Sequence, residues 1–326
     1  MSNLPRILDA ALEAPIVTSF SRIGCAVRSR TDHWTPLDDY DLTGRTAVVT
    51  GATSGLGRAI AEQLARCGAG VVLWGRDRVK TERIRDDLAA TTGSSALDIA
   101  VADLAEPDTV REAAQLLLAA HARLDVLVHN AGSLSTTRRT NSNGREATVA
   151  SQVLGPFLLT SLLLDRLRAS AVSRVITMSS GGMYAAPLTV DNLEMGSDYR
   201  GTEQYARVKR AQVTLNEMWA ERVPDSEVVF HAVHPGWADT PGVQESLPGF
   251  RRVMRPLLRT PAEGADTTVW LAADDEAIRS SGVFWHDRRR RPIHRLGSTR
   301  RSDTAQRRKD LWDWCIAATG EHPSIN

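Results

Sequence analysis

The feature that most constrains this chain is a regular alternation of short β-branched runs with longer helical patterns, which begins at residue 45. Neighbouring parallel strands need a crossover of about a dozen residues or more, usually a helix, so the alternation predicts βαβ units. We therefore predict an α/β fold with a doubly wound, mostly parallel, seven-stranded sheet and helices on both faces. The expected strands cover residues 46–49, 70–74, 97–101, 125–129, 174–177, 228–233 and 282–285, and the expected helices cover residues 57–66, 79–91, 107–121, 148–169, 204–222 and 262–273.

Two flanks lie outside this alternation. We divide the 326 residues into an N-terminal extension at 1–44, a central domain at 45–285 and a basic C-terminal extension at 286–326. Residues 4–27 have the pattern of an amphipathic helix interrupted at Pro15, which either packs on the body or rests on a membrane surface, and the sequence favours packing. A short helix at 305–318, with apolar residues such as Leu311 and Trp312, is expected to anchor the C-terminal extension.

The composition is that of an ordinary soluble protein. Hydrophobic residues make up 42% and charged residues 24% of the chain, which excludes collagen-like, disulfide-scaffold and disordered classes. The three cysteines, Cys25, Cys67 and Cys315, lie far apart, which suggests a reducing compartment. Because we find neither a secretory signal nor an uninterrupted apolar run of about 18 residues, we expect a cytoplasmic protein.

The formal net charge of +1 hides an asymmetry. Residues 288–309 contain ten Arg or Lys residues and one acid, Asp303, so this segment alone carries 10 − 1 = +9. Such a segment could contact nucleic acid or anionic lipid, but no nucleic-acid module accompanies it. Docking on the chain's own acidic surface is the competing interpretation.

A glycine-rich turn at Thr50–Gly57 follows the first expected strand and opens the first expected helix of the alternation. Its glycines permit a tight turn and a close approach of the backbone to a pyrophosphate, while the helix N-terminus supplies N–H groups. The spacing is GxxxGxG, and a plain glycine-rich connection is the alternative. We predict a Rossmann-type dinucleotide site that uses Gly51, Thr53, Ser54, Gly55, Leu56 and Gly57.

Arg76 follows the second expected strand, where NAD-selective sites usually place an acid. An arginine would attract the 2′-phosphate of NADP(H), whereas a carboxylate would repel it. The residue therefore favours NADP(H) as cofactor. A solvated loop arginine, and with it an NAD-preferring protein, is the alternative.

Tyr205 and Lys209 lie four residues apart in an expected helix, so their side chains share one face. A free phenol titrates near pH 10, and a nearby ammonium would favour its ionised form. Ser180 ends the expected strand at 174–177, at the sheet edge where open α/β folds bind ligands. We predict Ser180, Tyr205 and Lys209 as catalytic residues, although such a pair can also mark an exposed helix face, and strand-end serines often cap turns.

In this order the motifs resemble the short-chain dehydrogenase/reductase family, and within it the retinol-dehydrogenase-like branch. The resemblance covers residues 45–285 and includes Asp103-Leu104, His129-Asn130-Ala131-Gly132 and His234-Pro235-Gly236 followed by Thr240. It implies that Tyr205 donates or accepts the proton, that Lys209 lowers its pKa and holds the nicotinamide ribose, and that Ser180 steadies the reacting oxygen. It further implies cofactor contacts by Asp103, Leu104, Asn130, Ala131, Gly132, Tyr205, Lys209, Pro235, Gly236, Trp237 and Thr240.

Gln152 stands where this family usually has an asparagine that supports a water in a proton relay to the active-site lysine. The longer side chain either disables the relay or is an ordinary helix-surface glutamine. Pro156 has no N–H, so the carbonyl of residue 152 should lack its helical partner. We hypothesise that this free backbone carbonyl holds the water instead.

The segment 237–260, with apolar residues such as Trp237 and Phe250, is expected to fold over substrate as a mobile lid. A helix pair packed into the body is the alternative. We expect an NADP(H)-dependent oxidoreductase acting on a hydrophobic carbonyl or alcohol, and the rival is a catalytically impaired, NADP-binding regulatory or interaction protein. No metal site is expected, since His231 and His234 lack a third ligand, and a homo-oligomer is compatible with the resemblance.

Overall fold

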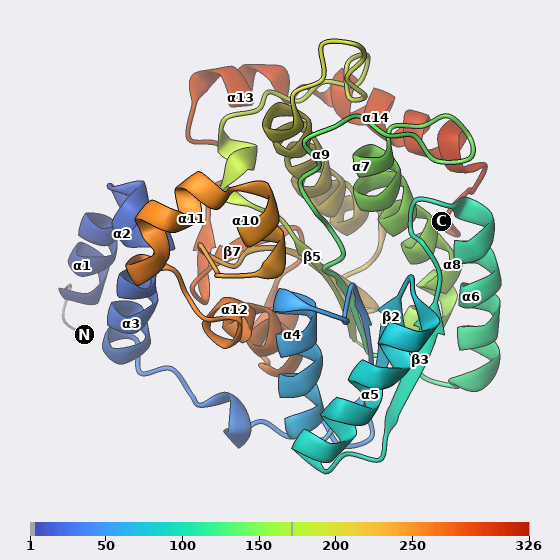
Figure 1. Ribbon diagram of the computed structural model, residues 1–326, viewed down its shortest axis with the longest axis horizontal. Coiled ribbons are helices and arrows are strands. Elements are labelled where there is room, and N and C mark those ends of the chain that lie inside the picture. Colours follow the sequence, from blue (N-terminus) through green and yellow to red (C-terminus); the bar gives the residue numbers. More distant parts are fainter. Residues whose placement is uncertain (1–3, 171, 326) are drawn as a thin grey trace.

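The computed structural model describes residues 4–170 and 172–325 and contains one eight-stranded sheet in the order β3-β2-β1-β4-β5-β6-β7-β8 (Figure 1). Strands β1 to β7 pair in parallel. Strands β2 and β3 lie on one side of β1, and β4 and the strands that follow it lie on the other. This arrangement confirms the predicted doubly wound α/β fold of the Rossmann type. The seven parallel strands are β1 (Thr46–Thr50), β2 (Gly70–Gly75), β3 (Leu97–Val101), β4 (Val126–His129), β5 (Ser173–Met178), β6 (Val228–His234) and β7 (Val283–His286).

An eighth strand corrects the predicted count of seven. Strand β8 (Arg289–Arg291) pairs antiparallel with β7, with Trp285 opposite Arg290. The two residues that connect the strands, Asp287 and Arg288, have positive φ angles of 52° and 53°, as a tight hairpin turn requires. The sequence concealed this hairpin because its turn contains no glycine and its strand is a run of arginines. Charged side chains on an edge strand also discourage pairing with another chain.

Helices cover both faces of the sheet, and each face buries its own apolar cluster (Figure 1). One face carries α4 (Gly55–Arg66), α5 (Arg78–Thr92) and α12 (Pro261–Ala273). The other carries α6 (Pro107–Ala120), α8 (Gly155–Ala169) and α9 (Gly201–Arg222). Strands buried on both sides read as continuous apolar runs, which explains why they were visible in the sequence.

Helix α8 continues a short helix, α7 (Ala147–Val149), through a π-helical turn at Ala150–Leu154. The combined stretch Ala147–Ala169 is long and apolar enough to cross a membrane, with a mean hydropathy of 1.6, but 78% of that window is buried inside the fold. Helix α14 (Ala305–Thr319) packs against α9 through Trp312, whose ring lies 4.8 Å from that of Trp219. The predicted anchor helix of the C-terminal extension is therefore confirmed.

The N-terminal extension forms three helices, α1 (Leu4–Glu13), α2 (Ile16–Phe20) and α3 (Arg22–Thr31), while residues 1–3 lie outside the described part. The chain breaks at Pro15, as predicted. The helices pack on the body through both apolar side chains, such as Phe20, and charged ones. Arg28 is fully buried, and its guanidinium contacts Asp9 at 2.8 Å, Glu13 at 2.8 Å and Asp287 at 2.6 Å.

The basic C-terminal segment finds acidic partners within the chain itself. Arg288 pairs with Asp266 at 2.8 Å, and Arg291 pairs with Asp9 at 2.7 Å. Further pairs join Arg289 to Asp32, Arg290 to Glu276 and Arg308 to Glu217. Much of the charge of this segment is thus neutralised inside the fold, as the second interpretation of the sequence required. The last residue of the predicted C-terminal extension, Asn326, lies outside the described part.

Three short helices complete the fold. Between α9 and α12 lie α10 (Pro241–Ser246) and α11 (Pro248–Met254), and α13 (Gly297–Ser302) precedes α14.

Candidate active site

The glycine-rich turn connects β1 to α4 and brings three predicted cofactor segments together. A Cβ atom on Gly51, whose φ is +66°, would lie 2.9 Å from the Ala131 Cα. A Cβ on Gly57 would lie only 2.2 Å from the Gly51 carbonyl oxygen, and one on Gly55 would lie 3.3 Å from the Thr240 Cβ. At Gly51 and Gly57 only glycine leaves room for these approaches. The turn therefore forms a backbone-lined cradle at the carboxyl ends of β1 and β4, bordered by Thr240.

Asn130 joins the end of β4 to the glycine-rich turn. Its side-chain Nδ2 donates to the Thr50 carbonyl at 2.9 Å, while the backbone N–H groups of Asn130 and Ala131 donate to Thr50 Oγ1, each at 3.0 Å. These bonds fix the spacing of the two strand ends. The Nδ2 group of Asn130 acts here as a structural tie, and the cofactor contact predicted for this residue stays a prediction.

Other predicted cofactor residues lie around the cradle. Thr53 lies against Gly75 at the end of β2, and a Cβ on Gly75 would approach the Thr53 Cγ2 to 2.9 Å. Arg76 follows and is exposed. Ser54 precedes α4 and makes no side-chain capping bond to it. The side chain of Leu56 packs toward Gly264. The carboxylate of Asp103 accepts a hydrogen bond from the Ala105 N–H at 2.9 Å.

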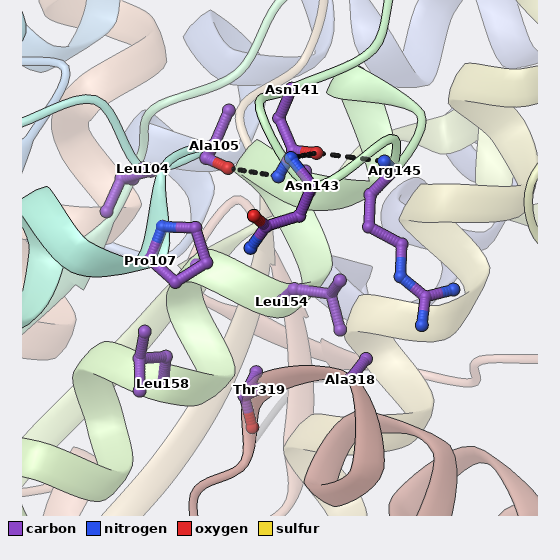
Figure 2. Close-up of a pocket in the computed structure, with 12 residues that line it drawn as sticks. Leu104, Ala105, Pro107, Asn141, Asn143, Arg145, Leu154, Leu158, Ala318 and Thr319 are labelled. Atoms are coloured by element: carbon purple, nitrogen blue, oxygen red, sulfur yellow. Dashed lines mark hydrogen bonds between the residues drawn. The ribbon is translucent and has the colours of Figure 1, made fainter.

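Leu104 is the predicted cofactor residue whose side chain turns into the core. It is 6% exposed and lines a pocket of about 30 Å³ beside the end of α14 (Figure 2). In that pocket Asn141 Nδ2 donates to the Ala105 carbonyl at 2.7 Å, and Asn141 Oδ1 accepts from the Arg145 N–H at 2.8 Å. None of the three predicted catalytic residues lines this pocket, so it is separate from the candidate catalytic centre.

The three predicted catalytic side chains meet at the carboxyl end of β5. Ser180 lies two residues after the end of the strand, and its Oγ accepts a hydrogen bond from the Gly182 N–H at 3.3 Å. Tyr205 and Lys209 lie on one face of α9, with the Lys209 Nζ 5.1 Å from the centre of the Tyr205 ring. The Ser180 hydroxyl lies near enough to the Tyr205 phenol to favour a lower pKa of that phenol. A hydroxyl, a phenol and an amine are thus grouped at one strand end.

The acid–base state of this group differs from the sequence expectation. Burial raises the pKa of Tyr205 to about 12, against a smaller lowering by Ser180. Burial also lowers the pKa of Lys209 to about 7, and its Nζ donates to the Met178 carbonyl at 3.0 Å. The expected depression of the Tyr205 pKa by Lys209 is therefore wrong for the protein by itself. The phenol is protonated at neutral pH and can serve as a proton donor.

The structure gives the Gln152 carbonyl a partner that the sequence did not reveal. A carbonyl oxygen has two lone pairs, so the hypothesis that it also holds a water stays a prediction. Pro156 has no N–H to offer the Gln152 carbonyl, and that carbonyl accepts a hydrogen bond from Gln212 Nε2 at 2.7 Å. The Gln152 side chain donates from Nε2 to the Ser133 carbonyl at 2.8 Å. A glutamine from α9 therefore replaces the lost backbone N–H. The signal for Gln212 was its position three residues after Lys209 on the same helix.

Phe20 is a site residue that the sequence reasoning missed. It is 4% exposed, and a Cβ on Gly181, the residue after Ser180, would lie 2.5 Å from the Phe20 Cε2. Its ring meets those of His234 at 4.2 Å and Trp237 at 5.8 Å, and its carbonyl accepts a hydrogen bond from the Trp237 N–H at 2.7 Å. The N-terminal extension therefore reaches the neighbourhood of Ser180. Nothing in the sequence links these distant positions.

The Pro235–Gly236 turn is held by a buried arginine, which the sequence reasoning also missed. Gly236 has a φ of +74°, and a Cβ there would lie 2.3 Å from the Arg259 Nε. Arg259 pairs with Asp287 at 2.5 Å, and both side chains are 1% exposed. In the described ranges, 4–170 and 172–325, no three His, Cys, Asp or Glu side chains converge as metal ligands.

Comparison with known proteins agrees with this geometry. The short chain dehydrogenase family model matches residues 45–249. The human dehydrogenase/reductase SDR family member 12 is 36% identical over 273 residues, covering 83% of this chain and 85% of the relative. Mouse retinol dehydrogenase 11 is 33% identical over 256 residues (76% and 79%), and "Putative daunorubicin C-13 ketoreductase DnrU" from Streptomyces sp. (strain C5) is 37% identical over 281 residues (86% and 94%).

Solved structures share the fold. The crystal structure of an uncharacterized protein from Mycobacterium paratuberculosis matches with a TM-score of 0.71 and 26% identity, covering 90% of this chain and 99% of that one. Together with the glycine cradle and the Ser180, Tyr205 and Lys209 group, these relationships place the chain in the short-chain dehydrogenase/reductase family, in its retinol-dehydrogenase-like branch.

Proposed function

We propose that this protein is an NADP(H)-dependent oxidoreductase that exchanges hydride between the nicotinamide ring and a hydrophobic carbonyl or alcohol. The coarser assignment, an oxidoreductase acting on CH–OH or C=O groups, follows from the family. The finer proposal is carried by one observation, the meeting of Ser180, Tyr205 and Lys209 at the strand end beside the glycine cradle. In a dinucleotide fold that sheet edge is where ligands bind.

The proposed roles of the cofactor and of the three side chains follow from their chemistry. The bound cofactor supplies or accepts the hydride. Ser180 Oγ donates a hydrogen bond to the substrate oxygen, and Tyr205 Oη gives that oxygen a proton in the reductive direction. Lys209, whose pKa of about 7 leaves it partly charged at neutral pH, faces the phenol ring and would stabilise the phenolate that proton transfer leaves behind.

The cofactor proposal extends to the pyrophosphate and the adenosine end. The positive-φ glycines of the cradle and the N-terminus of α4 suit a pyrophosphate, because the backbone can approach it closely. Arg76 is exposed directly after β2, where it can face a 2′-phosphate. We therefore propose NADP(H) over NAD(H).

We also propose that the segment 237–260 acts as a substrate lid. Its two ends are tied together, because the Arg259 N–H donates to the Trp237 carbonyl at 2.8 Å. Trp237 contacts Phe20 and Phe250 through its ring, which gives the region an aromatic lining suited to apolar substrates. The ketoreductase and retinol dehydrogenase names of two relatives support a hydrophobic carbonyl or alcohol as substrate.

The experiment that tests the function combines binding and turnover. The purified protein is incubated with NADPH and a panel of aromatic ketones, aliphatic aldehydes, retinoids and steroids, and the oxidation of NADPH is followed by its absorbance. We expect turnover of at least one apolar carbonyl. Tight NADPH binding without turnover of any compound would instead favour the catalytically impaired regulatory protein, in which Gln152 marks lost activity.

Replacement of Arg76 by alanine tests the cofactor preference. Because a hydrogen bond to a charged group contributes about 1.5–3 kcal/mol, we expect the KM for NADPH to rise roughly ten- to hundredfold, with little change for NADH. Steady-state kinetics with both cofactors measure the effect. Arg83→Ala, which removes an exposed arginine further along α5, is the matched control. Equal losses with NADPH and NADH would contradict the proposed role.

A further inference from the structure

The three N-terminal helices bury several charged side chains and expose several large apolar ones. On α1, Asp9 and Glu13 are engaged by buried Arg28, at 2.8 Å each, and Asp9 also pairs with Arg291 at 2.7 Å. The same helices expose Ile7 (62%), Leu8 (37%), Ile16 (51%), Val17 (44%) and Ile23 (42%). Exposure of this many large apolar side chains differs from the pattern expected for helices that cover a soluble domain.

These exposed side chains form one cluster. Among the described residues, nine large hydrophobic side chains are exposed, and five of them belong to the stretch 7–23, whose helices contact one another. A sixth, Val253 (77%), lies on α11, which neighbours α2 at the edge of the molecule (Figure 1). The contacts of Trp237 with Phe20 and Phe250 join these two elements. Concentrated apolar exposure of this kind marks an interaction surface.

The charges that border the cluster are positive. Arg22 and Arg30 on α3, and Arg252 and Arg255 at the end of α11, are exposed, and none of them forms an ion pair with the residues that the structure describes. The neighbouring acids Asp9, Glu13 and Asp32 are occupied by the arginines of the interior, and Asp239 pairs with Arg251. On α10 and α11, Glu245 is the one exposed acid. The surface therefore combines exposed aliphatic side chains with surrounding arginines that carry positive charge.

We propose that this surface, formed by α1 to α3 and α11, docks the protein on an anionic lipid membrane. Aliphatic side chains would enter the boundary between head groups and acyl chains, while the four arginines would contact anionic head groups. The charge pattern favours this occupant, because the four exposed arginines have no acidic partner among the described residues and a layer of anionic head groups supplies one.

The surface lies next to the candidate active site. Phe20, at the end of α2, contacts Gly181 beside Ser180 from the buried side of the same helix whose outer side exposes Ile16 and Val17. Under the proposed function, an apolar substrate dissolved in the membrane would therefore meet the lid region directly. The docking itself does not rest on that function, because lipid binding can be measured without any substrate.

Sedimentation with lipid vesicles tests the proposal on the full chain. We expect the protein to sediment with vesicles that contain phosphatidylglycerol and phosphatidylcholine, and far less with phosphatidylcholine alone. Burial of one isoleucine side chain contributes about 1.5–3 kcal/mol, so Ile16→Glu or Ile23→Glu should weaken binding roughly tenfold or more. Arg252→Gln should weaken binding to the anionic vesicles about fivefold.

Matched controls distinguish binding through the proposed surface from non-specific binding to the vesicles. Val79→Glu and Leu116→Glu change side chains that are 77% and 71% exposed on other helices, and they should bind vesicles like the unmodified protein. Circular dichroism melts check that each variant folds. The proposal is overturned if the unmodified protein does not sediment with the anionic vesicles, or if Ile16→Glu and Ile23→Glu bind these vesicles as strongly as the unmodified protein. It is also overturned if ultracentrifugation shows a dimer that these substitutions dissociate.

Discussion

Replacement of Tyr205 by phenylalanine is expected to lower kcat by a factor of about 10² to 10⁴, because the variant keeps the ring but loses the hydroxyl that exchanges the proton. The phenol is protonated in the protein, because burial raises its pKa to about 12. NADPH affinity should change much less, because the glycine cradle and Arg76 are untouched. Stopped-flow or steady-state turnover, with fluorescence titration of NADPH, measures both quantities.

Tyr40→Phe provides the control for this substitution. The Tyr40 hydroxyl donates to Asp274 at 2.6 Å, far along the chain from the candidate catalytic residues, so its loss should leave turnover unchanged. If Tyr205→Phe retained full kcat while Tyr40→Phe behaved like the unmodified protein, Tyr205 would not be the proton donor. A loss of NADPH binding in Tyr205→Phe would point to a structural role.

Asp287→Asn is expected to destabilise the fold by about 3–5 kcal/mol, the usual cost of removing one partner from a buried charge pair. Asp287 is 1% exposed and contacts two buried guanidinium groups, Arg28 at 2.6 Å and Arg259 at 2.5 Å. Asparagine tolerates the positive φ of 52° at this position, so the substitution removes the charge with little backbone strain. Urea denaturation followed by circular dichroism measures the free energy of unfolding.

The same carboxylate gives the effect a pH dependence with a definite sign. Burial alone would raise the pKa of Asp287, but His286, Arg259 and Arg28 outweigh burial and hold the pKa well below its usual range. Stabilisation by the ionised group is therefore present above the unfolded pKa of about 4 and is lost as the pH falls toward the folded value. The difference in stability between the unmodified protein and Asp287→Asn should shrink in acid.

Asp313→Asn is the control for the buried pair. Asp313 is 53% exposed on α14 and pairs with Lys309, which is 67% exposed, so its removal should change the stability by less than about 1 kcal/mol. Similar losses for Asp287→Asn and Asp313→Asn would show that the buried network contributes no more than a surface ion pair.

The sequence by itself determined the parts of this protein that rest on local pattern. The apolar runs of β1, β2 and β4 to β7 are buried on both faces, so they could be located, whereas β3 at the sheet edge is more exposed. The order of strands and helices followed from the same pattern. The glycine-rich turn and the spacing of Tyr205 and Lys209 were visible because backbone freedom and helical periodicity act over a few residues. The family followed from these motifs in order.

Only the tertiary structure decided the features that join distant parts of the chain. The hairpin at Asp287–Arg288, the insertion of Phe20 beside Gly181 and the support of the Gln152 carbonyl by Gln212 each depend on a neighbour that sequence spacing does not reveal. The direction of the Tyr205 and Lys209 pKa shifts likewise depends on burial rather than on their spacing. The physical reason is that local conformation is encoded in consecutive residues, whereas desolvation and long-range pairing are set by whatever the folded chain brings alongside.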